Sequence, residues 1–291
     1  MSSSSHPRRS VLYMPGSNPR ALAKGTGLPA DVLILDLEDA VAPDAKETGR
    51  EAIRAALADK VSYGDRELVV RVNGLDTAWG YGDLAAMATA GADAILLPKV
   101  ESGDMVRRAA AALDAAGASE ELPIWCMVET PRGVLNALEI ADQHRVRCLV
   151  MGTSDLTKDL LARETPDRLA MQTSLRLCLL AARAARIAIV DGVHLDLNDE
   201  EGLRIACEQG RDLGFDGKTL IHPKQIAAAN DAFGPSTEAV AKARRQIEAY
   251  EAALASGQGV AVLDGKLVEN LHVVEARRLV ALADAIEKRG G

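Results

Sequence analysis

The sequence predicts an α/β fold: a (β/α)8 barrel followed by a C-terminal extension that contains helices and a hairpin. Three observations lead to this prediction: short apolar runs recur along the chain, helical stretches separate them, and the pattern changes near residue 231. Strands that are apolar throughout and alternate with helices indicate a parallel sheet covered on both faces. Eight such units favour a closed barrel over an open doubly wound sheet.

The strands are predicted from apolar runs of four to six residues. In chain order they are Ser10–Met14, Val32–Asp36, Leu68–Val72, Ala94–Leu97, Pro123–Val128, Arg147–Met151, Ile187–Val190 and Phe215–Lys218. The connecting segments are rich in Ala, Leu, Glu and Arg at helical spacing, as in Met105–Ala116 and Leu169–Ala185. Asn198, which three acidic residues follow, predicts a helix start with a capping box.

The chain divides into a predicted catalytic barrel over residues 1–230 and an extension over residues 231–291. The extension begins with a long charged helix, Thr237–Ala255. Two short strands around an Asp264–Gly265 turn follow, and an amphipathic helix ends the chain. We expect this extension to cover the active site or to reach a neighbouring subunit.

Composition limits the partners that the protein can have. The net charge is −8 with scattered basic residues, so we expect no general binding to nucleic acid or to an anionic membrane surface. No apolar stretch reaches the roughly 18 residues that span a bilayer, and the Ser-rich start is predicted to be a disordered tail. The cysteines lack metal-type spacing and lie in apolar runs, which predicts buried free thiols and a cytoplasmic location. They are Cys126, Cys148, Cys178 and Cys207.

Polar residues close nearly every predicted strand. In chain order they include Ser17, Asn18, Asp36, Arg71, Asn73, Lys99, Glu129, Asp155, Asp191, Lys218 and His222. Active sites of barrels lie at the carboxyl ends of the strands, so this pattern predicts one functional mouth. The alternative, that loops are simply polar, does not explain why single charges close apolar strands at Arg71, Lys99 and Glu129.

Glu129 and Asp155 are the predicted metal ligands. Glu129 ends the fifth strand, and Asp155 lies in the loop after the sixth, so adjacent strands would bring the two carboxylates together. Hard oxygen ligands suit Mg²⁺ and leave several coordination positions for water and substrate. The alternative is that Asp155 caps the helix beginning at Leu156.

Other charged residues are predicted to surround this pair. Asp36, Glu38 and Asp39 follow the second strand and could orient metal-bound water, or they could form a solvated loop. Arg71 suits a substrate carboxylate, and the alternative is an ion pair with one of these acids. Lys99 is interpreted as an ion-pair partner rather than as a Schiff-base former.

Ordered motifs along the whole chain support a more specific hypothesis. They are VLYMPGSNPRAL, DLEDAVAPDAK, VVRVNGLDT, LLPKV, VETPRGV, MGTSDL, DGVHLDL, GFDGKTLIHPKQI and DGKLVEN. With these motifs the chain resembles the citrate lyase β-subunit-like family, which includes malyl-CoA, β-methylmalyl-CoA and citramalyl-CoA lyases. The resemblance implies a TIM barrel with Mg²⁺ in its mouth, a coenzyme A thioester as substrate, and a homotrimer or homohexamer.

The resemblance also implies roles for individual residues. Glu129 and Asp155 match the family's metal ligands, and Arg71 matches the arginine that holds the substrate carboxylate and the developing oxyanion. A backbone loop would contact the carboxylate of the 2-oxo acid. It consists of Gly152, Thr153 and Ser154.

The C-terminal motif departs from the family pattern at one position. In many relatives this motif carries an Asp directly after DGK, a hydrophobic residue and Val, and that Asp is the catalytic acid or base, often in a neighbouring subunit's site. Here the residue is Glu269, whose carboxylate lies one methylene further out, and the alternative is an ordinary surface acid. Arg20 and Lys24, after the first strand, are candidates for binding the CoA phosphates.

The predicted activity is therefore reversible carbon–carbon cleavage of a 3-hydroxyacyl-CoA into a 2-oxo acid and acetyl-CoA or propionyl-CoA. One alternative is a citrate lyase β-subunit that acts on an acyl-carrier-protein thioester. Others are a free-acid aldolase, a thioesterase that hydrolyses malyl-CoA, and a catalytically silent barrel that serves as a binding subunit.

Overall fold

The computed structural model describes residues 6–290, and these form two compact units. One unit is Arg8–Phe233, and the other contains the chain from Gly234 onward together with His6 and Pro7. The predicted disordered tail falls on residues 1–5, which lie outside the described range.

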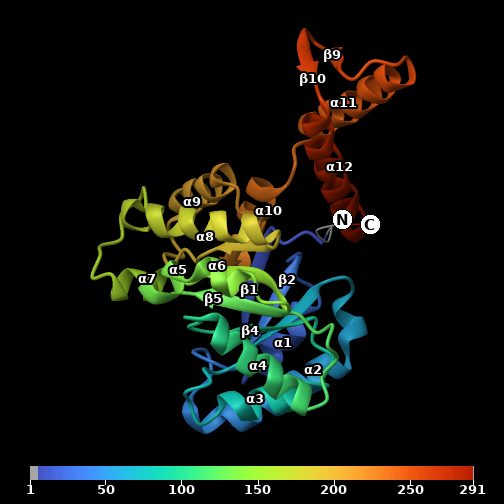
Figure 1. Cartoon of the computed structure of the whole chain (residues 1–291). Coiled ribbons are helices and arrows are strands. Elements are labelled where there is room, and N and C mark those ends of the chain that lie inside the picture. Colours follow the sequence, from blue (N-terminus) through green and yellow to red (C-terminus); the bar gives the residue numbers. More distant parts are fainter. Residues whose placement is uncertain (1–5, 291) are drawn as a thin grey trace. The chain divides into compact units, whose positions relative to one another are not determined.

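The unit Arg8–Phe233 is a closed barrel of parallel strands in sequence order, in which β1 pairs with β8 to complete the ring (Figure 1). The strands are β1 (Ser10–Pro15), β2 (Val32–Asp36), β3 (Glu67–Arg71), β4 (Ala94–Leu97), β5 (Ile124–Val128), β6 (Val146–Met151), β7 (Ala188–Asp191) and β8 (Gly217–Leu220). The predicted (β/α)8 barrel is confirmed.

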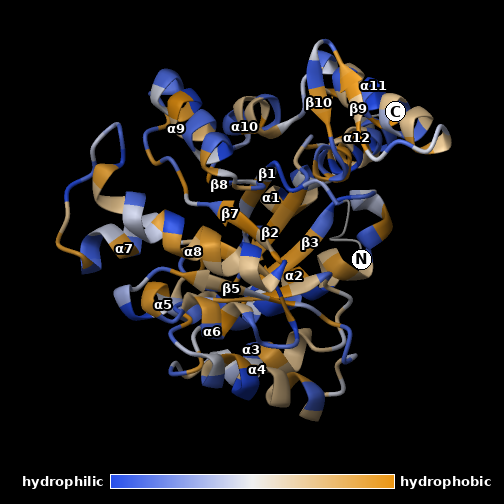
Figure 2. Ribbon diagram, turned by 45° about the horizontal axis from the view of Figure 1, so that its top comes forward, coloured by the Kyte–Doolittle hydropathy of each residue, from blue (hydrophilic) through white to orange (hydrophobic). Residues whose placement is uncertain are grey.

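Helices connect the strands and cover the outside of the barrel (Figure 2). They are α1 (Pro19–Gly25), α2 (Lys46–Ala58), α3 (Gly80–Met87), α4 (Gly103–Ala115), α5 (Pro131–Leu135), α6 (Ala137–Ala141), α7 (Thr153–Asp159), α8 (Gln172–Ala185), α9 (Glu200–Leu213) and α10 (Ile226–Phe233). Short 3-10 turns lie at Pro43–Ala45, Lys60–Tyr63, Leu169–Met171 and Pro223–Gln225.

Alternation along each strand divides the apolar core into two layers. Residues such as Ile34, Val69 and Trp125 fill the barrel interior, whereas their neighbours Leu33 and Leu68 pack against the helices. Strands β2 to β5 are buried along their whole length, which is why they are apolar on both faces. Residues that continue the interior face beyond the apolar layer therefore point into the mouth of the barrel.

Two local predictions differ from the structure. Strand β8 begins two residues later than the predicted Phe215 and contains the polar residues Lys218 and Thr219, both of them fully buried and hydrogen-bonded. Apolar periodicity cannot locate such a strand. Helix α9 is capped by Asp199, whose side chain accepts from the Gly202 amide, so the assignment of Asn198 as the cap was wrong.

The cysteines are all buried and free, as predicted. Among residues 6–290, no helix combines the length and apolarity required to cross a membrane.

The second unit contains the predicted hairpin between two long helices. Its elements are α11 (Thr237–Ala255), β9 (Ala261–Leu263), β10 (Lys266–Val268) and α12 (Asn270–Gly290). Asp264 and Gly265 both have positive φ, which suits a tight turn between antiparallel strands. Tyr250, Val268 and Val273 form its small core. That this unit covers an active site stays a prediction.

Candidate active site at the carboxyl ends of the strands

Arg71 lies at the end of β3, directly beside Asp36 at the end of β2. Its Nε and Nη2 each donate to one Asp36 oxygen at 2.7 Å, a bidentate pair in a buried setting. Its Nη1 lies 2.8 Å from Glu38 Oε2 without the direction of a hydrogen bond, and its hydrogen-bond acceptor is the sulfur of Met127 at 3.9 Å. The predicted ion pair with the neighbouring acids is therefore present, but Nη1 has only a weak acceptor.

The turn that carries Glu38 and Asp39 is fixed from both sides, and within it Asp36 and Glu38 are buried rather than solvated. Asp36 accepts from the amides of Glu38 at 2.9 Å and Ala40 at 3.0 Å. The buried Lys46 ammonium donates to the carbonyl oxygens of Leu37 and Glu38, both at 2.7 Å. The side chain of Asp39 remains 68% exposed at the rim.

Glu129 follows β5 and is buried, with 4% of its surface exposed. Its Oε1 accepts from the amide of Lys99 at 2.8 Å, and Lys99 has a left-handed φ of +49°. Burial and the nearby Glu38 carboxylate raise the pKa of Glu129 to about 7, although the Lys99 amide and Arg71 oppose the shift. The site thus holds a carboxylate that lacks sufficient compensating positive charge.

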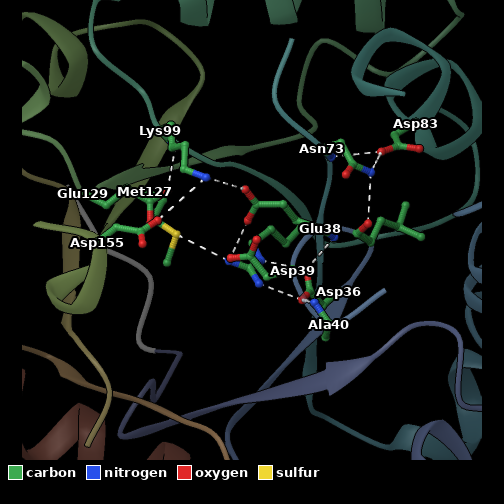
Figure 3. A network of polar contacts seen from close by, with 12 residues as sticks. Asp36, Glu38, Asp39, Ala40, Asn73, Asp83, Lys99, Met127, Glu129 and Asp155 are labelled. Atoms are coloured by element: carbon green, nitrogen blue, oxygen red, sulfur yellow. Dashed lines mark hydrogen bonds and ion pairs between the residues drawn. The ribbon is translucent and has the colours of Figure 1, made fainter. Parts of the chain in front are cut away.

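Lys99 lies between two acidic residues of the mouth, Glu38 after β2 and Asp155 after β6 (Figure 3). Its ammonium lies 3.4 Å from Glu38 Oε1 and 3.7 Å from Asp155 Oδ2. Burial would lower the pKa of Lys99, but the carboxylates of Glu38 and Glu129 outweigh it and the pKa is raised. Lys99 is therefore a charged ion-pair partner, as interpreted from the sequence.

Asp155 lies in the first turn of α7, not at its N-cap, which is Gly152. The predicted alternative role as a cap for Leu156 is therefore wrong. The Asp155 side chain is 39% exposed and accessible from the mouth. Asp155 and Glu38 both pair with the ammonium of Lys99, and the backbone amide of Lys99 donates to Glu129.

The backbone after β6 passes very close to Glu129. A Cβ atom on Gly152 would overlap the Cβ and carboxylate of Glu129, and a Cβ atom on Gly192 would overlap the side chain of Thr153. Glycine is therefore required at both positions by close packing. Through Gly152 the predicted substrate-contacting loop lies next to the predicted metal ligand Glu129, and in this loop Thr153 is buried and Ser154 is half-buried.

Asp191 and Lys218 do not join this cluster, so the prediction that every strand end belongs to one mouth is wrong for them. Both are fully buried, with Lys218 Nζ 3.1 Å and Arg168 Nη1 2.7 Å from Asp191 Oδ2. Asp191 follows the interior residue Val190 on β7 and so faces outward to α9, where a Cβ atom on Gly210 would meet it, and Lys218 on β8 pairs with Asp191. They stabilise the outer packing of the barrel.

The remaining predicted residues lie elsewhere. Arg20 and Lys24 are exposed on one face of α1 and form no ion pair within residues 6–290. Glu269 belongs to the second unit, at the start of α12, where its amide donates to Nδ1 of His272 at 3.0 Å. Among the described residues, no set of three or more His, Cys, Asp and Glu side chains is arranged to hold a metal.

Lys46 and Tyr13 were missed at the sequence level. Tyr13 lies on the interior face of β1, and the Arg71 guanidinium lies 4.8 Å from the centre of its ring. It reads as an ordinary aromatic in an apolar strand, and Lys46 reads as one charge among many at a helix start. Only their tertiary contacts distinguish them.

Comparison with known proteins is consistent with this geometry. Residues 9–223 match the HpcH/HpaI aldolase/citrate lyase family. The chain is 56% identical to a (3S)-malyl-CoA thioesterase of Cereibacter sphaeroides, over 98% of both chains. It is 38% identical to the citrate lyase β-subunit of Leuconostoc mesenteroides subsp. cremoris, covering 96% of this chain and 94% of that one.

Among solved structures, CitE from Mycobacterium tuberculosis in complex with magnesium, acetoacetate and coenzyme A matches with a TM-score of 0.76 and 32% identity. The match covers 97% of this chain and 100% of that one. The family resemblance and the prediction of an enzyme are thereby confirmed.

Proposed function

The chain belongs to the HpcH/HpaI aldolase/citrate lyase family, and we propose on that basis that it is a Mg²⁺-dependent enzyme acting on a coenzyme A thioester of the malyl-CoA class. Such a substrate carries a hydroxyl group and a carboxylate near the thioester. The observation that supports this most is the acidic cluster around Glu129 and Asp155, placed in one mouth with the incompletely satisfied guanidinium of Arg71.

The charge of the cluster fits a divalent cation. It contains five carboxylates and two cations, namely Asp36, Glu38, Asp39, Glu129, Asp155, Arg71 and Lys99. With all acids ionised, five negative charges face two positive ones, which leaves an excess that Mg²⁺ would offset. Glu129 and Asp155 would hold the ion. When bound, it polarises substrate oxygens and lowers the pKa of a bound hydroxyl or water.

Arg71 would hold the substrate carboxylate through Nη1. Asp36 fixes the other two nitrogens, so the guanidinium is held rigidly. Nη1 forms an ion pair with Glu38 at 2.8 Å, but its hydrogen-bond acceptor is the thioether of Met127. A carboxylate oxygen is a far stronger acceptor, and the pair would be charge-assisted. The amides after Gly152 would contact the same end of the substrate.

We propose hydrolysis of the thioester as the net reaction, because relatives at 54–56% identity are named (3S)-malyl-CoA thioesterase. Water attacks the thioester carbonyl, the carbon–sulfur bond breaks, and the products are the free hydroxy acid and coenzyme A, whose sulfur takes the proton. Glu269, supplied by the second unit of a neighbouring copy in a homotrimer or homohexamer, would accept the proton from the attacking water.

Carbon–carbon cleavage is the second candidate, favoured by the same carboxylate-binding site and by the 38% identity to a citrate lyase β-subunit. A base removes the proton of the substrate hydroxyl, the adjacent carbon–carbon bond breaks, and a 2-oxo acid and the enolate of an acyl-CoA result. Arg71 would stabilise charge on the oxo-acid oxygen, and Glu269 would protonate the enolate carbon.

Product analysis separates the two reactions. We would offer (3S)-malyl-CoA, β-methylmalyl-CoA and both citramalyl-CoA enantiomers with Mg²⁺, and follow the free thiol and the 2-oxo acid in parallel. Hydrolysis releases free thiol without a 2-oxo acid, whereas carbon–carbon cleavage releases a 2-oxo acid without free thiol. Glu129→Ala should lower either activity at least about 100-fold, because it removes a metal ligand.

Absence of both products from all four thioesters, with a folded protein that binds Mg²⁺, would contradict the proposed substrate class. The search would then turn to acyl-carrier-protein thioesters. A folded protein that binds no Mg²⁺ would instead favour the catalytically silent barrel.

A further inference from the structure

The hydroxyl group of Tyr13 is a buried polar group with no hydrogen-bond partner within residues 6–290. Tyr13 continues the interior face of β1 above Val11, and its ring packs against the interior core. The guanidinium of Arg71 lies over that ring at 4.8 Å from its centre. The hydroxyl therefore lies at the floor of the mouth, beside the residue that we expect to bind the substrate.

Packing does not account for this hydroxyl. Leaving a buried donor unpaired is unfavourable, and each such group in a folded protein calls for an explanation. A phenylalanine would keep the ring against Arg71 and avoid the unpaired group. The hydroxyl is thus unfavourable for stability by itself, and no residue within 6–290 pairs with it, so a ligand or a water molecule is left to accept its hydrogen bond.

Location separates Tyr13 from Trp125, another aromatic residue with a buried unpaired atom. Trp125 Nε1 is also unpaired, but Trp125 lies deeper in the barrel, where Arg8, just before β1, covers its ring. Tyr13 is instead surrounded by the groups of the proposed site. Burial raises the pKa of Tyr13, Asp36 and Glu129 raise it further, and only Arg71 opposes the shift. The hydroxyl therefore keeps its proton and is available as a donor.

We propose that Tyr13 is a substrate-binding residue whose hydroxyl donates a hydrogen bond to an oxygen of the carboxylate or hydroxyl group that Arg71 holds. This inference rests on the proposed function, because it takes the occupant of the mouth to be an anionic hydroxyacyl group. Arg71 stacks on the Tyr13 ring, and its Nη1 is the nitrogen that Asp36 does not bind. An oxygen bound to Nη1 would lie close to this tyrosine.

A pair of tyrosine variants tests the proposal. Tyr13→Phe removes only the hydroxyl, and we expect kcat/KM for the thioester that the enzyme turns over to fall about 10- to 100-fold, as for a lost hydrogen bond to a charged group. The melting temperature should stay the same or rise, because an unpaired buried group is removed. Affinity for MgCl2 alone, measured by titration calorimetry, should not change.

Tyr63→Phe is the matched control. The hydroxyl of Tyr63 is also buried, but it donates to the Leu22 carbonyl at 3.0 Å on the helix-facing side of the barrel, away from the mouth. We expect this variant to lose about 2–4 °C in melting temperature and to keep kcat/KM within about twofold of the unchanged enzyme. The two variants should thus show opposite effects.

Three results would overturn the inference. The first is an unchanged kcat/KM in Tyr13→Phe. If Glu129→Ala is inactive at the same time, the proposed function stays intact and only the role of Tyr13 is wrong. Another is a loss of Mg²⁺ affinity in proportion to the loss of activity, since the hydroxyl would then act on the metal site. The third is a drop in melting temperature as large as that of Tyr63→Phe. Failure of the unchanged enzyme to turn over any thioester would contradict the proposed function as well.

Discussion

At the scale of single residues, Glu129 makes the most specific prediction, because its carboxylate is buried beside other acids. In the metal-free protein its pKa of about 7 is above the ordinary value of 4.5, so between these values the folded state binds more protons than the unfolded state. The free energy of unfolding must therefore fall as pH rises through this window, by about 1.4 kcal/mol for each pH unit between the two pKa values.

Glu129→Gln removes this titration. In EDTA, the variant should become more stable than the unchanged protein between pH 5 and pH 8, while at pH 8 only the unchanged protein should gain stability from Mg²⁺. Thermal unfolding at a series of pH values, with and without Mg²⁺, measures both effects. Identical pH dependence of stability in the two proteins would show that the pKa of Glu129 is not raised in the folded protein.

Residue types predicted much of this site, because single charges that close apolar strands are conspicuous. Glu129, Arg71 and Lys99 were found in this way, and the structure brings them together. Their partners were not predictable, since the bidentate contact of Arg71 with Asp36 depends on the register of two strands. Tyr13 was invisible for the opposite reason: its chemistry lies in one unpaired atom, not in an unusual residue type.

At the scale of elements, the loop from β6 into α7 determines how closely the backbone approaches the proposed metal ligand. A side chain at Gly152 would have to displace Glu129. We expect Gly152→Ala to lower the affinity for Mg²⁺ and kcat/KM at least about 10-fold, because misplaced ligands bind metals poorly. Calorimetric titration with MgCl2 and steady-state kinetics measure the two effects.

Gly27→Ala is the control for this substitution. Gly27 lies in the turn after α1, where a Cβ atom would meet nothing closer than the Lys24 carbonyl at 4.0 Å. This variant should keep its affinity for Mg²⁺ and its activity. Equal effects of the two substitutions would mean that Gly152 has no special relation to Glu129.

Elements were predicted well where apolar burial is strong. Strands β2 and β4 begin and end where they were predicted to. Apart from Asp36, the last residue of β2, all their residues are apolar. Strand β8 was displaced by two residues, since buried Lys218 and Thr219 are stabilised by Asp191 from another strand. Local sequence does not contain that information.

At the scale of the whole molecule, the division between the barrel and the second unit raises the question of which barrel Glu269 serves. We predict that it acts on a neighbouring copy. Glu129→Ala and Glu269→Ala proteins, each inactive alone, should then regain activity when unfolded together and refolded at equal amounts. The expected activity is about one quarter, because half of the barrels and half of the C-terminal units are intact.

Activity in the mixture requires that one copy contributes the barrel and another contributes Glu269. If each chain served its own site, every site in the mixture would carry one of the two substitutions. The mixture would then remain as inactive as the separate variants, and the prediction of a shared site would be wrong.

The central claim is that the acidic cluster is a Mg²⁺ site used to process a malyl-type CoA thioester. The most direct measurement is a Mg²⁺ titration of EDTA-treated enzyme with (3S)-malyl-CoA, following free thiol and 2-oxo acid together. We predict no turnover without the metal, saturable recovery with it, and release of free thiol, all of which Glu129→Ala should abolish. Turnover that is unaffected by EDTA and by Glu129→Ala would contradict the account.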